Sequence, residues 1–206
     1  MAALVLSIPL LRAPAPCGQV EDCVAAVVNG SPVTLVDLRI VQRFGLIAAD
    51  PGPASLSAVL DKLIEQKLVS DFARGPSAPS PEEIAQAGNE ALRKIGPEAW
   101  SGALAEFGIT EADLRPFLEE MVDYRKAVAA RFSQAAPVTI KEIEDYYRDV
   151  YAPERRAAGE EPTPLVQVLD TIESRIQQGR REKLVADWIG NLKAKAEILV
   201  NRSCLE

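Results

Sequence analysis

The residue types that most often perform chemistry in enzymes are sparse in this 206-residue chain, which contains no histidine. Histidine is the commonest general base and metal ligand, so Ser–His and Cys–His nucleophile pairs are excluded. Two carboxylate pairs, Glu82/Glu83 and Glu119/Glu120, are best interpreted as solvated helix faces or first-turn charges. No glycine-rich phosphate loop follows a predicted strand. We therefore expect no catalytic residue, no metal site and no cofactor.

The cysteines offer a different chemistry. Cys17, Cys23 and Cys204 lack metal-ligand spacing, but two of them could form a disulfide, either Cys23–Cys204 or the local pair Cys17–Cys23. The choice depends on how the chain ends are arranged. If a strand after Cys23 pairs antiparallel with one before Cys204, these cysteines approach at one end of the sheet, whereas parallel pairing would separate them.

The N-terminal stretch has features of an export signal. Residues 2–11 (AALVLSIPLL) are apolar but too short to span a bilayer, and residues 13–15 (APA) have the small-x-small form of a signal-peptidase site. The usual basic opening segment is missing, and Pro16 is unfavourable for a lipoprotein anchor at Cys17. Residues 1–22 are thus either an atypical export signal, which predicts a periplasmic or other extracytoplasmic location, or a disordered tail.

The composition describes a globular protein of one or two domains. Apolar residues make up 48% of the chain and charged residues 26%, which is unlike a disordered sequence. The net charge of −7 opposes nucleic-acid binding, which requires an excess of lysine and arginine.

The two ends of the chain carry the predicted β-structure. The sequence VVNGSPVT predicts a hairpin in which Val24–Val28 turns at Asn-Gly and returns through an edge strand, because Pro32 cannot donate to a ladder. Ile198–Val200 predicts a third strand. A two-stranded hairpin is marginal alone, so we expect Ile198–Val200 to pair beside Val24–Val28.

Apolar residues repeat with helical spacing through the rest of the chain. Thr34 is expected to cap the first helix, and Ser80 and Thr139 begin capping-box sequences. Pro116 predicts a kink or a late start in its helix, and Ala152–Pro164 predicts a linker rich in proline and charge. The predicted helices cover residues 35–47, 56–73, 81–95, 97–107, 111–132, 140–151 and 165–196.

The order of these pieces resembles the SurA/PrsA-type extracytoplasmic chaperones. The resemblance covers Cys23–Asn201 and is carried by VAAVVNGSPVT, VLDKLIEQKLVSDFA, GITEADLRPFLEEMVDYRKAV, VTIKEIEDYYRD and LDTIESRIQQGRREKLVADWIGNLKAKAEILV. Members of that family usually insert a parvulin-type prolyl isomerase domain before the final helix. Here Arg148–Pro164 fills the gap and is too short to form a domain.

The resemblance implies a mainly α fold, a helical chaperone core with an N-terminal β-hairpin and a C-terminal strand forming a small sheet. It divides the chain into an export signal or tail (1–22), an N-terminal chaperone module (23–147), a linker replacing the parvulin domain (148–164), a C-terminal helix and strand packing back on that module (165–201) and a tail (202–206).

The implied function is to hold unfolded client polypeptides without ATP and without isomerase activity. Contact with a membrane is expected only through an N-terminal signal. Two alternatives remain, a structural adapter for one defined protein partner and an inactive relative of the peptidyl-prolyl isomerases. Phe117 and Met121 have a simpler interpretation as core side chains, but they join the candidate client contacts, which are Trp100, Phe107, Phe117, Met121, Tyr124, Tyr146, Tyr147 and Tyr151.

Overall fold

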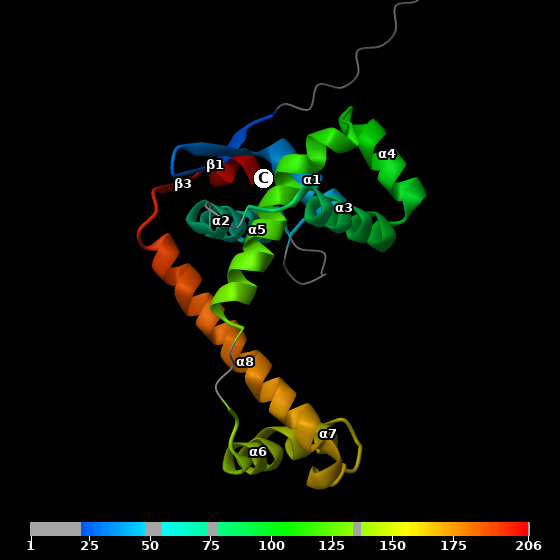
Figure 1. Cartoon of the computed structure of the whole chain (residues 1–206), viewed down its shortest axis with the longest axis vertical. Coiled ribbons are helices and arrows are strands. Elements are labelled where there is room, and N and C mark those ends of the chain that lie inside the picture. Colours follow the sequence, from blue (N-terminus) through cyan, green and yellow to red (C-terminus); the bar gives the residue numbers. More distant parts are fainter. Residues whose placement is uncertain (1–21, 48–54, 74–77, 134–136, 206) are drawn as a thin grey trace, which may run out of the picture.

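The computed structural model describes residues 22–47, 55–73, 78–133 and 137–205, and it confirms a mainly helical chain with a small sheet (Figure 1). The predictions for residues 1–21, including Cys17, concern a part of the chain outside the described residues. The elements are β1 (Val24–Val28), β2 (Ser31–Thr34), α1 (Leu35–Phe44), α2 (Leu56–Ala73), α3 (Pro81–Ile95), α4 (Pro97–Phe107), the 3-10 helix η1 (Glu111–Leu114), α5 (Arg115–Arg131), α6 (Ile140–Tyr146), the π-helical turn η2 (Tyr147–Tyr151), α7 (Ala152–Ala157), α8 (Leu165–Lys193), β3 (Ile198–Val200) and the 3-10 helix η3 (Arg202–Leu205).

Local side-chain chemistry sets the helix starts. The Thr34 hydroxyl accepts a hydrogen bond from the Asp37 amide at 3.2 Å, and the Asp37 carboxylate accepts one from the Thr34 amide at 2.8 Å. These reciprocal bonds satisfy donors that the first turn leaves free. The same capping box opens α3 through Ser80 and Glu83, and α6 through Thr139 and Glu142.

Pro116 delays the start of α5, as predicted. The chain first forms η1 over Glu111–Leu114, and α5 begins at Arg115 with Pro116 in its first turn. At that position the missing amide hydrogen costs little, because first-turn amides have no partner within the helix.

The two chain ends meet in one antiparallel sheet of order β2-β1-β3. Asn29 and Gly30 both have positive φ, 48° and 80°, which matches the tight primed turn that suits a two-residue hairpin. Pro32 lies on the edge strand β2, and β3 pairs with β1 so that Leu199 faces Val27. The predicted pairing of Ile198–Val200 with Val24–Val28 is confirmed.

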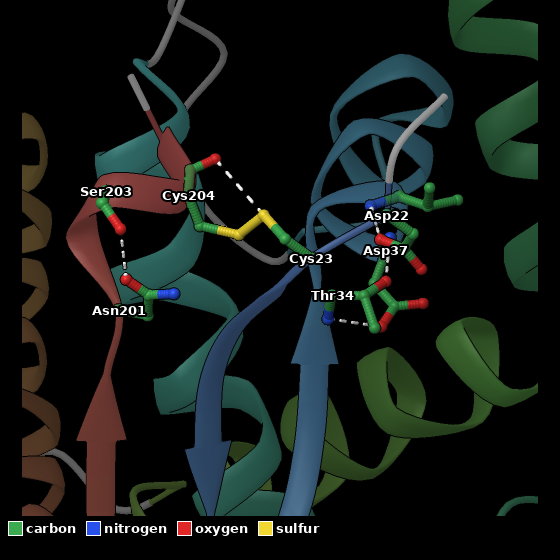
Figure 2. The surroundings of a disulfide bond; sticks show 8 residues. Asp22, Cys23, Thr34, Asp37, Asn201, Ser203 and Cys204 are labelled. Carbon is green, nitrogen blue, oxygen red and sulfur yellow. Dashed lines mark hydrogen bonds between the residues drawn. A yellow bond between two sulfur atoms is a disulfide. The ribbon is translucent and has the colours of Figure 1, made fainter. Parts of the chain in front are cut away.

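A disulfide fastens the open end of this sheet (Figure 2). Because β3 runs antiparallel to β1, the η3 turn after β3 brings Cys204 back to Cys23, with 6.1 Å between their Cα atoms. The Asn201 amide donates to the Ala25 carbonyl at 2.8 Å and extends the ladder by one bond. Residues 202–205, predicted as a tail, therefore form a 3-10 turn whose Cys204 and Leu205 pack on the core.

The main body consists of the sheet and α1–α5, with the C-terminal half of α8 against it (Figure 1). Helix α2 lies centrally and contacts β1, α1, α5 and α8. Its apolar residues are buried around the helix, so α2 has almost no solvent face in the middle of its length. The buried α2 residues are Val59, Leu60, Leu63, Ile64, Gln66, Leu68, Val69 and Ser70.

A smaller far lobe stands away from the main body at the other end of α8 (Figure 1). Helix α8 has 29 residues and spans about 43 Å at 1.5 Å per residue. Its N-terminal half packs with α6, η2 and α7 around a separate small core of Ile143, Tyr151 and Ile172.

The far lobe corrects two sequence-based boundaries. The sequence-based division places residues 140–146 in the N-terminal module, but α6 packs with α8 in the far lobe. The predicted linker 148–164 is largely helical, because η2 and α7 continue the chain from α6 as far as Ala157. Pro153 stands in the first turn of α7, where proline is tolerated, so it does not end the helical path.

Candidate functional site

The predicted client contacts fall into three separate places. Trp100 and Phe107 of α4 pack on Phe44 of α1, with ring centroids 4.9 Å and 6.4 Å from that of Phe44. The Trp100 indole N–H donates to Glu111 at 3.0 Å, so its polar atom is also satisfied. Trp100 is buried and Phe107 is partly buried in the main core.

Phe117 and Met121 of α5 face the interior of the main body. Met121 is 1% exposed, and Phe117 is partly buried against the same core. An extended client cannot reach such buried side chains without opening the fold. Trp100 and Met121 are therefore core residues, which corrects the assignment of Trp100 as a client contact and confirms the simpler interpretation of Met121 as a core side chain.

The three clustered tyrosines build the far lobe. The rings of Tyr147 and Tyr151 stack with centroids 5.5 Å apart, and the Tyr147 hydroxyl donates to the Thr163 carbonyl at 3.0 Å. Tyr151 is 6% exposed, and Tyr146 packs on the same small core. Tyr151 is thus structural, again correcting the prediction, and Tyr147 ties the turn before α8 to η2.

Tyr124 lies closer to the surface, where α5 meets α8. It packs beside Val69, Trp188 and Ile189, a small cluster between α2, α5 and α8. Burial raises the pKa of the Tyr124 phenol, and the nearby Glu65 carboxylate raises it further. Tyr124 therefore stays a neutral hydrogen-bonding group throughout the physiological pH range.

An exposed aromatic site that the sequence did not reveal adjoins this cluster. The Trp188 ring of α8 meets Phe72, at the end of α2, and Phe132, just after α5, each edge-on with centroids 5.6 Å apart. Phe72 is 59% exposed, although a continued apolar stripe after Leu68 would predict burial. Trp188, by contrast, is only 8% exposed and anchors the site.

We call this site the junction groove. It is a pocket of about 540 Å³ where α2, α5 and α8 converge. Its lining combines an aromatic wall with the small side chains of α5, and consists of Phe72, Ala73, Asp123, Lys126, Ala127, Ala129, Ala130, Arg131 and Trp188.

The charges around the junction groove are engaged with neighbours. Asp123 accepts a hydrogen bond from the Ser70 hydroxyl at 3.0 Å, and Lys126 pairs with Glu83 at 2.7 Å. The Lys126 ammonium, followed by the Ser80 amide, holds the pKa of Glu83 below its usual value. The Lys126 charge is therefore neutralised by Glu83, and the aromatic wall remains the main attraction for an apolar ligand.

Arg131 gives the groove one cation over its aromatic wall. Its guanidinium carbon lies 5.2 Å from the centroid of the Trp188 ring and 5.9 Å from that of Phe132. A planar guanidinium over an aromatic face retains spare donors, which can bind backbone carbonyls or carboxylates of a ligand.

Across residues 22–47, 55–73, 78–133 and 137–205, no group of histidine, cysteine, aspartate or glutamate side chains could hold a metal ion. The helices of that same portion include none with the length and apolarity needed to cross a membrane.

Comparison with known proteins adds no identification. No family model matches the chain, and no curated protein sequence is similar enough to be counted as a relative.

Proposed function

We propose that the protein is an ATP-independent chaperone that holds unfolded or extended polypeptides, and that the junction groove is its principal client-binding surface. The observation that carries the proposal is Phe72, a phenylalanine that is 59% exposed beside a pocket of about 540 Å³. Large apolar side chains exposed next to a hollow are typical of surfaces that bind polypeptides.

The chemistry of the groove suits many different clients. Phe72 and Trp188 offer broad apolar contact, and alanines of α5 leave space for side chains of different size. Leu184, one turn before Trp188 on α8, adds a further exposed apolar side chain to that helix. Weak, loosely defined contacts of this kind favour promiscuous binding over a single partner.

The resemblance to SurA/PrsA-type chaperones supports the same function independently of the groove. The disulfide between Cys23 and Cys204 supports an extracytoplasmic location, because such bonds persist in oxidising compartments and are rare in reducing ones. We therefore propose that the chaperone acts outside the cytoplasm.

The proposal is tested by light scattering from several unrelated denatured clients at a near-stoichiometric ratio without ATP. The wild-type protein is expected to slow their aggregation, and Phe72→Ala is expected to weaken client binding by about 1–2 kcal/mol. The matched control is Val166→Ala, which removes an 84% exposed apolar side chain at the far-lobe end of α8. It should protect clients as well as the wild type does.

The outcomes separate the chaperone from its alternatives. If no client is protected, the chaperone proposal is wrong, and if protection is confined to one partner, the protein is an adapter. If Phe72→Ala and Val166→Ala protect equally well, the client surface lies elsewhere. Thermal unfolding of both variants serves as the folding control, and little change is expected because both side chains are largely exposed.

A further inference from the structure

A second pocket, on the opposite side of the last turns of α5, has a different chemistry. It has a volume of about 680 Å³ and shares Ala129 with the junction groove. We call it the basic hollow. Its lining comes from α3, α5, α8 and the chain after α1, and consists of Ile47, Lys94, Tyr124, Arg125, Val128, Ala129, Phe132, Ser133 and Arg181.

Positive charge gathers along the basic hollow. A smaller hollow of about 270 Å³ shares Lys94 and Arg125 with it and adds Arg93 on α3. Of the residues lining these two hollows, only Glu90 is acidic, and it pairs with Arg125 at 3.1 Å. Within the described chain, neither Lys94 nor Arg181 forms an ion pair.

This cationic surface stands out because the chain as a whole carries a net charge of −7. Like charges that gather without anionic partners repel one another, so a local excess of cations favours binding of an anionic ligand. The same lining includes the apolar side chains of Ile47, Val128 and Phe132. A fitting ligand therefore carries carboxylates and apolar groups side by side.

We propose that the basic hollow binds acidic side chains of the client, so that the protein prefers extended polypeptide segments in which aspartate or glutamate alternates with apolar residues. The inference rests on the proposed function and extends it from apolar contact to charge selection. Nucleic acids and anionic membranes fit less well, because their many charges would meet the net negative charge of the remaining surface.

The test uses two fluorescein-labelled peptides of equal length, one alternating leucine and glutamate and the other alternating leucine and glutamine, with binding followed by fluorescence anisotropy. The wild-type protein is expected to bind the glutamate peptide about fivefold more tightly. That preference should shrink when NaCl is raised from about 50 mM to about 500 mM, because salt screens exposed charges.

Matched variants test whether the preference for the glutamate peptide arises in the basic hollow. Combining Lys94→Gln with Arg181→Gln should abolish it, whereas combining Lys183→Gln with Arg156→Gln should preserve it. The control removes the same charges from exposed sites outside the hollow. The charge-conserving pair Lys94→Arg and Arg181→Lys should retain the preference, which distinguishes lost charge from lost structure.

Other outcomes overturn the inference. If both peptides bind equally to the wild type, or if the control pair loses the preference too, the basic hollow does not select charge, yet the proposed chaperone function stands. If neither peptide binds, both proposals fail. Competition by a short single-stranded DNA as effective as that by the glutamate peptide would show a general anion site in place of a polypeptide site.

Phe72→Ala keeps the two proposals distinguishable. This variant should weaken the binding of both peptides by a similar factor and leave the ratio of their dissociation constants unchanged. The reason is that Phe72 lies in the junction groove and not in the basic hollow.

Discussion

Cys23 and Cys204 stand 181 positions apart in the sequence, yet their Cα atoms lie 6.1 Å apart and a disulfide joins them (Figure 2). The bond closes nearly the whole described chain into one loop. Closing a long loop restricts the unfolded chain strongly, so the bond is expected to stabilise the protein mainly through its unfolded state.

The first prediction concerns this bond. The double variant Cys23→Ser and Cys204→Ser should lower the free energy of unfolding by about 2–4 kcal/mol. Urea denaturation of the oxidised proteins measures the change, and reducing the wild type should reproduce it. Cys17→Ser should leave the stability unaltered. A loss of stability in Cys17→Ser instead would indicate the local pair Cys17–Cys23.

The second prediction separates β3 from the disulfide. Truncation after Glu197 removes β3, η3 and Cys204, whereas Cys204→Ser removes only the bond. Each ladder hydrogen bond contributes about 0.5–1.5 kcal/mol, so the truncated chain should be less stable than Cys204→Ser. Equal urea midpoints for these two proteins would mean that β3 contributes nothing to the fold.

The third prediction concerns the tyrosines of the far lobe. Tyr151→Ala should destabilise the lobe by about 3–5 kcal/mol, because it empties the centre of a small core. Tyr147→Phe removes only the hydrogen bond to the Thr163 carbonyl and should cost about 1 kcal/mol. Hydrogen exchange of the α6 amides measures both effects. Equal protection of the α6 amides in the two variants would contradict the conclusion that Tyr151 is a core residue of the lobe.

The fourth prediction is an acid sensitivity of the α6 start. The Thr139 amide and hydroxyl, and then Arg180 of α8, hold the pKa of Glu142 below its usual value. The folded state therefore prefers the charged Glu142 carboxylate. The stability that this carboxylate contributes is complete above its pKa in the unfolded chain, and it is lost as the pH falls through its lower pKa in the folded protein.

Hydrogen exchange, corrected for its intrinsic pH dependence, should show α6 opening below about pH 4.5. Glu142→Gln should remove much of this pH dependence and leave α6 less protected at neutral pH. An α6 that keeps its full protection at acid pH would show that the capping box does not hold the lobe.

The fifth prediction is the absence of prolyl isomerase activity. The chain has no histidine, and only residues 158–164 separate α7 from α8, which leaves no room for a parvulin domain there. In a protease-free assay a Xaa-Pro peptide should isomerise at its uncatalysed rate, over tens to hundreds of seconds. A rate that rises in proportion to protein concentration would contradict the prediction.

Local chemistry made most of the fold predictable. Asn-Gly set the hairpin turn, and the threonine and serine caps set helix starts at Leu35, Pro81 and Ile140. The strand pairing followed from a hairpin that needed a partner. Each of these features depends on residues close in sequence, or on a requirement that only one other segment could meet.

The candidate site was harder to predict because it depends on where distant helices converge. Phe72 continues an apolar stripe and would be expected in the core, yet α2 ends beyond the edge of that core. Tyr151 borders a polar segment, so its sequence context left a core position and an exposed position equally open, and the π-helical turn directs it into the core of the far lobe. Neither outcome is encoded in the neighbouring residues.

The sheet also fixes the order in which the chain can complete its fold during synthesis. Ala26 pairs with Val200, so β1 is synthesised long before β3, and the sheet cannot be completed until β3 has been made. Contacts between such distant segments form slowly. Until β3 has been synthesised, β1 therefore has one unpaired edge.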